Sequence, residues 1–254
     1  QMGYSWQVAL AAVFVEGIIF IILSLTKVRE AIFNCIPPAL KYGVTSGIGL
    51  FIAFIGMQNA KIVVDGPTLV GLYPFRAALL DGSFYTVGIG AFLALMGTLL
   101  TAILMAKKVP GGILWGILIT WAAGMICEIT GIYIPDPAQG MFSVMPDFSH
   151  GIAIPSLAPT FMQLDFSAIA TLNFLTIMLT FMFVDLFDTL GTLIGVASKA
   201  DMLDKQGRLP NIKGALMADS IATTAGAILG TSTVTTFVES SSGVGAGGRT
   251  GLTA

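Results

Sequence analysis

Apolar blocks separated by short polar stretches run through the whole sequence, and the length of these blocks limits what the chain can fold into. An α-helix rises about 1.5 Å per residue, so about 20 apolar residues cross the roughly 30 Å hydrocarbon core of a bilayer. Of the 254 residues, 55% are hydrophobic and 10% are charged. A water-soluble domain usually carries about a quarter of charged residues. The sequence therefore predicts an all-α polytopic membrane protein.

Six complete spans are predicted, followed by an interrupted segment that begins near Ser232. The predicted spans cover residues 7–26, 41–58, 84–105, 111–133, 166–196 and 212–230. Residues 31–40 contain two adjacent prolines and are predicted to form a short interfacial turn. The chain does not begin with Met and ends within a glycine-rich tract, so we expect it to be a piece of a longer protein.

Basic residues indicate which loops face the cytoplasm, because Lys and Arg concentrate on that side of short loops. Basic residues follow the first, third and fifth spans: Lys27, Arg29, Lys41, Lys107, Lys108, Lys199, Lys205, Arg208 and Lys213. The alternate loops hold only Lys61 and Arg76, and residues 134–165 contain neither Lys nor Arg. We therefore predict a multi-pass protein of the cell membrane in which residues 199–213 are cytoplasmic and residues 134–165 face outside.

Several other functions are excluded by charge and spacing. The formal net charge is -2 and the basic residues are scattered, which argues against nucleic acid as a partner. Cys35 and Cys127 lie far apart in apolar surroundings and predict neither a disulfide nor a metal site. Residues 243–248 match the GxGxxG dinucleotide fingerprint, but no βαβ pattern surrounds them. No metal and no cofactor are expected.

The fifth predicted span carries a polar stripe. Asp185, Asp188, Thr189 and Thr192 stand at positions i, i+3, i+4 and i+7, which share one face of a helix. A charged side chain at the bilayer centre costs about 2.5–3.5 kcal/mol, so such residues usually face a cavity and mark a transport pathway. We predict that Asp188 is the main functional residue of this stripe. For Asp185, two interpretations stay open: a functional role, or only a hydrogen bond to a neighbouring helix.

A second polar cluster occupies the end of the chain. Residues 233–238 are β-branched or aromatic and favour an extended backbone, whereas the serines that begin at Ser240 are typical of helix N-termini. The pattern predicts an extended stretch that breaks into a half-helix at Glu239. Broken helices at membrane depth line cavities or are buried in protein, and in transporters they form binding sites.

Four further residues have a predicted role within the spans. Glu16 is an unusual carboxylate in the middle of the first span, where a pathway role and an interhelical hydrogen bond both stay open. Asp219 is predicted to anchor a loop. Gly191 and Gly195 form a GxxxG step that is expected to let a neighbouring helix approach closely.

These motifs together resemble the adenine/guanine/hypoxanthine permease branch of the nucleobase–cation symporters, within the xanthine/uracil permease superfamily. The similarity covers essentially the whole chain. The matching runs are KVRE from Lys27, IPP from Ile36, KYGVTSGIG from Lys41, DLFDTLGT from Asp185, NIKGALMADSIATTAG from Asn211 and ESSSGVGAGGRTG from Glu239.

The resemblance implies a fourteen-span fold of two inverted seven-span repeats, with a substrate-holding core domain and a gate domain. Residues 1–165 would then correspond to the fourth to seventh spans and the outer loop, and residues 166–254 to the eighth to tenth spans. In this family the substrate lies between two broken helices, the third and the tenth spans, and the third lies outside this chain. The acidic residues of the eighth and tenth spans match Asp188 and Glu239.

The resemblance further implies a secondary active transporter that imports a purine nucleobase, and no enzyme. The expected substrate-binding residues are Asp188, Glu239, Phe237, Val238 and Thr192, with Asp185, Thr189 and Ser240 as secondary candidates. We expect Asp188 and Glu239 to couple transport to a cation, H⁺ in preference to Na⁺. A homodimer is left open.

Two alternatives belong to other functional classes. The same fold could carry a small anion, although two acids would repel such a cargo. The DxxD spacing of Asp185 and Asp188 is also typical of the Mg²⁺-diphosphate clamp of membrane prenyltransferases. Such a clamp needs a second Asp-rich motif and basic residues at membrane depth, and the sequence contains neither.

Overall fold

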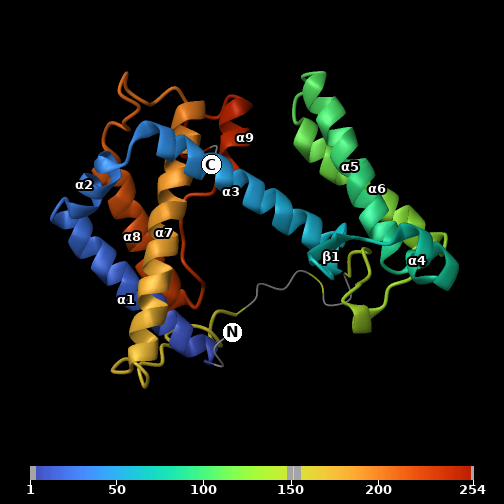
Figure 1. Ribbon diagram of the computed structural model, residues 1–254, viewed down its shortest axis with the longest axis horizontal. Helices are drawn as coiled ribbons and strands as arrows, with labels where there is room; N and C mark the ends of the chain where they lie inside the picture. Colours follow the sequence, from blue (N-terminus) through green and yellow to red (C-terminus); the bar gives the residue numbers. More distant parts are fainter. Residues whose placement is uncertain (1–3, 148–150, 152–155, 253–254) are drawn as a thin grey trace. The chain divides into compact units, whose positions relative to one another are not determined.

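The computed structural model describes residues 4–147, 151 and 156–252, and its described residues form two compact units (Figure 1). The first unit joins residues 1–49 to residues 154–254, and the second comprises residues 50–153. The first unit therefore combines both ends of the chain. The predicted division at residue 165, which follows the two inverted repeats, stays a prediction.

The first unit consists of helices that are distant in sequence. Its helices are α1 (Trp6–Leu25), α2 (Val28–Cys35), the first part of α3 (Pro38–Asn59), α7 (Leu172–Lys199), α8 (Ile212–Leu229) and α9 (Ser240–Gly245). The side chains of Ser5 and Thr171 accept hydrogen bonds from the first turns of α1 and α7. Such caps satisfy backbone N–H groups that a helix leaves unpaired at its beginning. Gly230 ends α8 with a φ of 89°, a left-handed conformation that glycine adopts without strain.

Close glycine contacts hold the helices of this unit together. α1 packs along α8 and α7. A Cβ atom at Gly17 of α1 would clash with Oγ1 of Thr224 in α8. On α7, Cβ atoms at Gly191 and Gly195 would clash with Ile48 and Thr45 of α3. The predicted close approach at the GxxxG step is therefore confirmed, and the approaching helix is α3.

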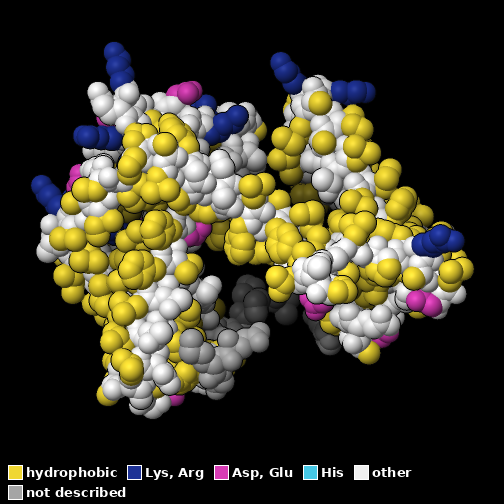
Figure 2. Space-filling view, in the orientation of Figure 1, with side chains coloured by type: hydrophobic (Ala, Val, Ile, Leu, Met, Phe, Trp, Pro, Cys, Tyr) yellow, Lys and Arg dark blue, Asp and Glu magenta, His cyan; other side chains and the backbone are white. Residues whose placement is uncertain are grey.

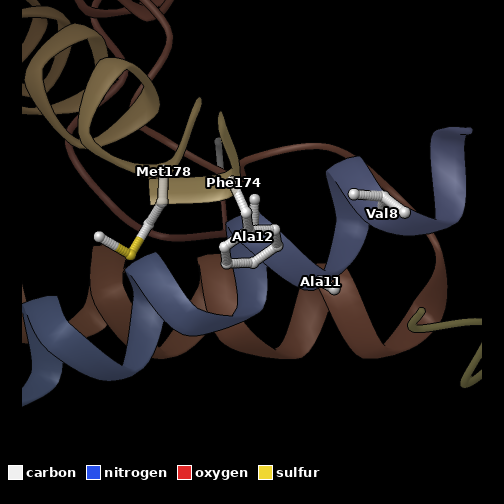
Figure 3. Close-up of a cluster of buried hydrophobic side chains, with 5 residues drawn as sticks. All are labelled: Val8, Ala11, Ala12, Phe174 and Met178. Atoms are coloured by element: carbon white, nitrogen blue, oxygen red, sulfur yellow. The ribbon is translucent and has the colours of Figure 1, made fainter. Parts of the chain in front are cut away.

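Two apolar clusters fill the space between these helices. Figure 3 shows the first, in which Val8, Ala11 and Ala12 of α1 meet Phe174 and Met178 of α7. The small alanine side chains let the two helices approach while the larger side chains fill the gaps, as close packing of an interior requires. The second cluster consists of Phe33, Leu190, Ile194, Ile212 and Leu216. It joins α2, α7 and α8 where the basic connections begin.

At the opposite end of the first unit, the segment before α7 is tied to α1 and α8. The backbone N–H of Asp165 donates to the carbonyl of Gln7 at 3.2 Å, and that of Met162 donates to the carbonyl of Ile228 at 2.8 Å. The Asp165 carboxylate accepts from the backbone N–H of Ser167 at 2.8 Å. This hydrogen bond, together with one from the Ser167 hydroxyl, holds the pKa of the Asp165 carboxyl below its usual range.

The second unit contains two long helices and a hairpin. Its elements are β1 (Val63–Gly66), β2 (Leu69–Leu72), α4 (Phe75–Asp81), η1 (Ser83–Tyr85), α5 (Gly88–Ala106), α6 (Gly112–Ile129) and η2 (Pro137–Gln139). The strands are antiparallel, with Val63 opposite Leu72 and Gly66 opposite Leu69. α5 and α6 pack through reciprocal glycine–threonine contacts, because Gly97 meets Thr120 and Gly116 meets Thr101.

Six helices of the described residues are long and apolar enough to cross a membrane, and they coincide with the six predicted spans. The predicted turn at residues 31–40 is wrong, because α2 occupies Val28–Cys35 and α3 already begins at Pro38. Proline fits the first turn of a helix, where its missing N–H would have no partner. The hairpin formed by β1 and β2 has no counterpart among the predicted elements.

Two of the basic residues assigned to loops are buried. Arg29 and Lys41 are 1% and 3% exposed. Figure 2 shows that the other basic side chains of the first unit gather at its α2 end. Arg29 therefore acts inside the protein, in addition to marking the charged side of the membrane.

Candidate functional site

The polar stripe of α7 faces the interior of the first unit. Asp185, Thr189 and Thr192 are buried, and Asp188 is half-buried. The helical spacing brings all four side chains onto one face, as the sequence predicts. The four side chains differ in what they contact, because their neighbours come from different segments of the chain.

A cavity of about 560 Å³ opens beside the stripe. α1, α7 and the segment after α8 form its walls. It is lined by Trp6, Ala9, Leu10, Val13, Phe181, Val184, Asp185, Asp188, Gly230, Ser232, Thr233 and Thr235. One wall is therefore apolar and aromatic, whereas carboxylates and hydroxyls lie on the others. Pockets for small molecules have volumes of about 300–1,000 Å³ and combine such surfaces.

Arg29 of α2 lies behind this cavity and pairs with two acids. One of its terminal nitrogens, Nη2, lies 2.8 Å from Oδ2 of Asp219 and 3.6 Å from Oδ2 of Asp185. The other, Nη1, donates to the Leu216 carbonyl at 3.1 Å and to the Ser220 hydroxyl at 2.8 Å. The guanidinium also stacks on the ring of Phe20, 4.0 Å from the ring centroid. A buried arginine requires such complete pairing because an isolated buried charge is costly.

Asp219 is predicted to anchor a loop, and in the structure it pairs with Arg29 of helix α2. α2 lies between the first two membrane-spanning helices, and Asp219 holds it against α8. The hydrogen bond joins residues that are 190 positions apart. Helical periodicity describes only neighbours along one element and gives no sign of this pairing.

Thr189 connects the buried charges to the segment that follows α8. Its hydroxyl lies 3.4 Å from Oδ1 of Asp185 and 3.4 Å from both carboxylate oxygens of Asp219. It also lies 3.1 Å from the hydroxyl of Thr235. The hydroxyl of Thr223 donates to the carbonyl of Val234 at 3.0 Å. Side chains of α7 and α8 thus supply hydrogen-bond partners to the non-helical segment. This segment needs such partners because its backbone forms no helical hydrogen bonds.

The interrupted helix that the sequence predicts is present. Residues 231–237 have no regular secondary structure, and α9 begins at Ser240. Glu239 immediately precedes α9, is exposed, and makes no side-chain capping hydrogen bond. Its carboxylate is close enough to repel that of Asp188. Asp188 lines the cavity, whereas Glu239 does not, so a shared role of the two acids stays a prediction.

The other predicted site residues occupy different positions. Phe237 is exposed, Val238 is half-buried and Ser240 is exposed at the start of α9, and none of the three lines the cavity. Thr192 donates to the carbonyls of Asp188 and Thr189 in its own helix. Their roles in substrate binding stay predictions.

The sequence analysis did not single out several residues of the site. Trp6, Phe181 and Thr235 line the cavity, and Arg29 balances the acids behind it. The aromatic residues lie in apolar spans in which any one of many side chains could face a cavity. Arg29 follows the first span in a basic stretch. The apolar residues beside it in α2 are the sequence feature that indicates packing of this stretch against the protein.

The described residues contain no group of three or more His, Cys, Asp or Glu side chains that could hold a metal ion. The arrangement offers hydrogen-bond acceptors on Asp185 and Asp188, hydroxyls on Thr233 and Thr235, and an aromatic side chain at Trp6. Such a surface suits a small, flat molecule that has N–H groups on its edges.

Comparison with known proteins identifies the family. Residues 1–254 match the xanthine/uracil permease model, described as a permease family. A Methanocaldococcus jannaschii protein, named as a permease without a substrate, is 51% identical over 98% of this chain and 51% of its own length. The guanine/hypoxanthine permease PbuG of Bacillus subtilis is 44% identical over 98% of this chain and 52% of its own length. The adenine permease AdeQ of Escherichia coli is 36% identical over 100% of this chain and 51% of its own length.

The chain thus spans about half the length of these curated relatives. The match covers both units and includes all six helices that could cross a membrane. Relatives named for guanine, hypoxanthine and adenine distinguish the purine branch from the rest of the family. The chain belongs to the xanthine/uracil permease family, in its adenine/guanine/hypoxanthine permease branch, and is part of a multi-pass membrane transporter.

Proposed function

We propose that the complete protein is a secondary active transporter that imports a purine nucleobase together with a proton. The observation that carries this proposal is the cavity beside α7, in which Asp188 and the threonines of the interrupted segment share one space. The names of the relatives PbuG and AdeQ support a purine substrate. The missing spans of the family would complete the cavity.

The chemistry of the cavity suits a purine base. Purine bases present N–H groups and ring nitrogens on their edges, and carboxylates accept from the former while hydroxyls donate to the latter. Asp188 supplies a carboxylate, and Thr233 and Thr235 supply hydroxyls. Aromatic side chains such as Trp6 stack on the flat face of a base, which contributes about 1–3 kcal/mol per base in other proteins. Glu239 is our proposed second acceptor, at the mouth of α9.

A proton is the proposed coupling ion because the site is rich in acids. Asp188 is half-buried and lines the cavity, so neutralising its carboxylate removes a charge from a partly dehydrated place. A carrier that is neutral only when proton and base are both bound crosses its occluded state at lower cost. We assign the exchangeable proton to Asp188, which lines the cavity.

The anion alternative is disfavoured by the position of the nearest cation. An anion carrier needs a positive group or a free helix N-terminus at its site. Arg29 pairs with Asp219 and does not line the cavity. The carboxylates that do line it would repel an anion.

The test uses the complete protein in proteoliposomes with labelled guanine, hypoxanthine and adenine. We expect Asp188→Asn to keep measurable purine binding but to lose both the pH dependence of uptake and accumulation against a gradient. Asp201→Asn is the matched control, because Asp201 is exposed beyond the end of α7 and should behave as the unmodified protein. Accumulation by Asp188→Asn with an unaltered pH profile, or uptake that follows Na⁺ and ignores pH, would contradict the proton role. Failure of the unmodified protein to bind any of the three bases would contradict the proposal that its substrate is a purine nucleobase.

A further inference from the structure

Glu16 is a buried carboxylate with no hydrogen-bond partner among the described residues. It lies in the middle of α1, and its exposed fraction is 0%. Neither Oε1 nor Oε2 accepts a hydrogen bond. A buried polar group without a partner is rare in proteins and requires a physical explanation.

The helices packed around Glu16 leave its side chain without exposed surface. The next residue, Gly17, is in such close contact with Thr224 of α8 that a Cβ atom would not fit. Glu16 is buried, and the charged groups near it come from three other helices: Asp185 of α7, Arg29 of α2 and Asp219 of α8. Two of these three groups are acids, so the surroundings disfavour a negative charge on Glu16.

The one cation near Glu16 in the described structure is already engaged. Arg29 lies 2.8 Å from Asp219 and 3.6 Å from Asp185, and its other donors reach Leu216 and Ser220. The cluster thus contains three carboxyl groups and one guanidinium. Ionisation of all three acids would leave two uncompensated negative charges in this buried cluster, and a neutral Glu16 reduces that excess to one.

We propose that Glu16 binds a proton and lies in the protein as a neutral carboxylic acid, and that Asp185 connects this proton site to the cavity. The second part is argued from two features of Asp185. It lines the cavity, while its Oδ2 is buried without a hydrogen-bond partner, as are both oxygens of Glu16. In this route a proton from the cavity is taken up by the Asp185 carboxyl group and passes to the Glu16 carboxylate, which restores the Asp185 carboxylate.

This site deepens the proposed proton coupling, on which its role in transport rests, but its existence can be tested without a substrate. Asp188 exchanges its proton at the cavity, whereas Glu16 holds a second proton behind it. The carrier would then have two proton positions at different depths. Infrared spectroscopy separates them, because a carboxylic acid and a carboxylate absorb at different frequencies.

The first experiment compares infrared spectra of the complete protein at neutral pH and without purine. The difference between the unmodified protein and Glu16→Gln should contain the C=O band of a carboxylic acid and no carboxylate band. Gln is isosteric with the protonated side chain, and Glu16→Met should give the same difference if Gln impairs folding. Loss of a carboxylate band in either variant, or a thermal stability that rises with NaCl but not with choline chloride, would overturn the proposal in favour of an ionised or sodium-bound Glu16.

Asp165→Asn is the matched control for the band assignment. The pKa of Asp165 is lowered by its hydrogen bonds to Ser167, so its carboxyl group is ionised at neutral pH. Its difference spectrum should therefore show loss of a carboxylate band, opposite to that of Glu16→Gln. This control establishes that the spectra distinguish the two forms in this protein.

The second experiment tests the route through Asp185. Transfer of the complete protein into D₂O shifts the C=O band of Glu16 as its proton exchanges. Asp185→Asn should slow this shift several-fold, and Asp201→Asn should leave its rate unchanged. An unaltered rate in Asp185→Asn would refute the route, and purine binding measured on the same samples would show separately whether the proposed substrate is correct.

Discussion

At the scale of single residues, the buried charges of the first unit are arranged around one guanidinium. Arg29 pairs with Asp219 and faces Asp185, and Thr189 links both acids to Thr235. Removing Asp219 would take away the closer of the two acids that pair with Arg29. The Arg29–Asp219 pair therefore stabilises the fold mainly because, without it, Arg29 would lose its closest charged partner.

The corresponding prediction concerns Asp219→Asn. We expect this change to lower the free energy of unfolding by about 3 kcal/mol, because Arg29 keeps only the more distant Asp185 as a charged partner. The measurement is thermal unfolding of the complete protein in detergent, with Asp201→Asn as the control for loss of an exposed carboxylate. Equal melting temperatures of the two variants would show that the pair contributes no net stability.

At the scale of helices, contacts between glycine and β-branched residues determine which helices approach closely. Because glycine has no side chain, Thr224 of α8 lies directly against Gly17 of α1, and Ile48 of α3 lies directly against Gly191 of α7. In a membrane the hydrophobic effect does not draw helices together, so dispersion contacts at such small residues have a larger share in helix association. One added methyl group is consequently enough to test an interface.

We expect Gly17→Ala to destabilise the protein by about 1–3 kcal/mol, the usual cost of overpacking. Its added Cβ would clash with Thr224 Oγ1 and would lie 3.0 Å from the Thr224 backbone nitrogen. Gly43→Ala in α3 is the matched control, because nothing lies within 4 Å of its added Cβ. The control should be neutral or should stabilise the helix by about 0.5–1 kcal/mol. Thermal unfolding in which both variants behave alike would disprove the interpretation of the α1–α8 contact.

The six long helices could be predicted from sequence because length and apolarity are local properties. The ends agree within a few residues, except that α7 begins at Leu172 instead of residue 166. α2 was missed because eight residues that mix charged and apolar side chains do not resemble a span, and their apolar face has meaning only against α7 and α8. The stripe on α7 could be predicted because helical spacing is a local property. Its pairing with Arg29 could not be predicted because it depends on how distant helices pack.

At the scale of the whole molecule, the basic side chains of the first unit gather at its α2 end. In the first unit, α2 and the connection after α7 meet in the cluster around Phe33 and Leu190, while the segment before α7 lies at the opposite end. This arrangement is what alternate loops of a helical membrane protein require. The orientation relative to the cytoplasm stays a prediction from the positive charges.

Cysteine labelling of the complete protein in intact cells tests this orientation. In a background without Cys35 and Cys127, a membrane-impermeant reagent should modify Ala138→Cys and leave Lys205→Cys unmodified until the cells are opened. Both positions are exposed, so that accessibility within the protein does not decide the result. The reverse pattern would require the opposite orientation.

The partnership of Arg29 with Ser220 and Asp219 also has a consequence for biosynthesis. Arg29 and Ser220 are separated by 191 residues, which a ribosome translates in about 10–40 s at 5–20 residues per second. During that interval α1 and α2 have left the ribosome, whereas α8 does not yet exist. Glu16 and Arg29 must wait in the translocon, at the lipid surface or with a chaperone until α8 is inserted. The nascent first unit is consequently held open by the order of synthesis, and it closes only when its last helices arrive.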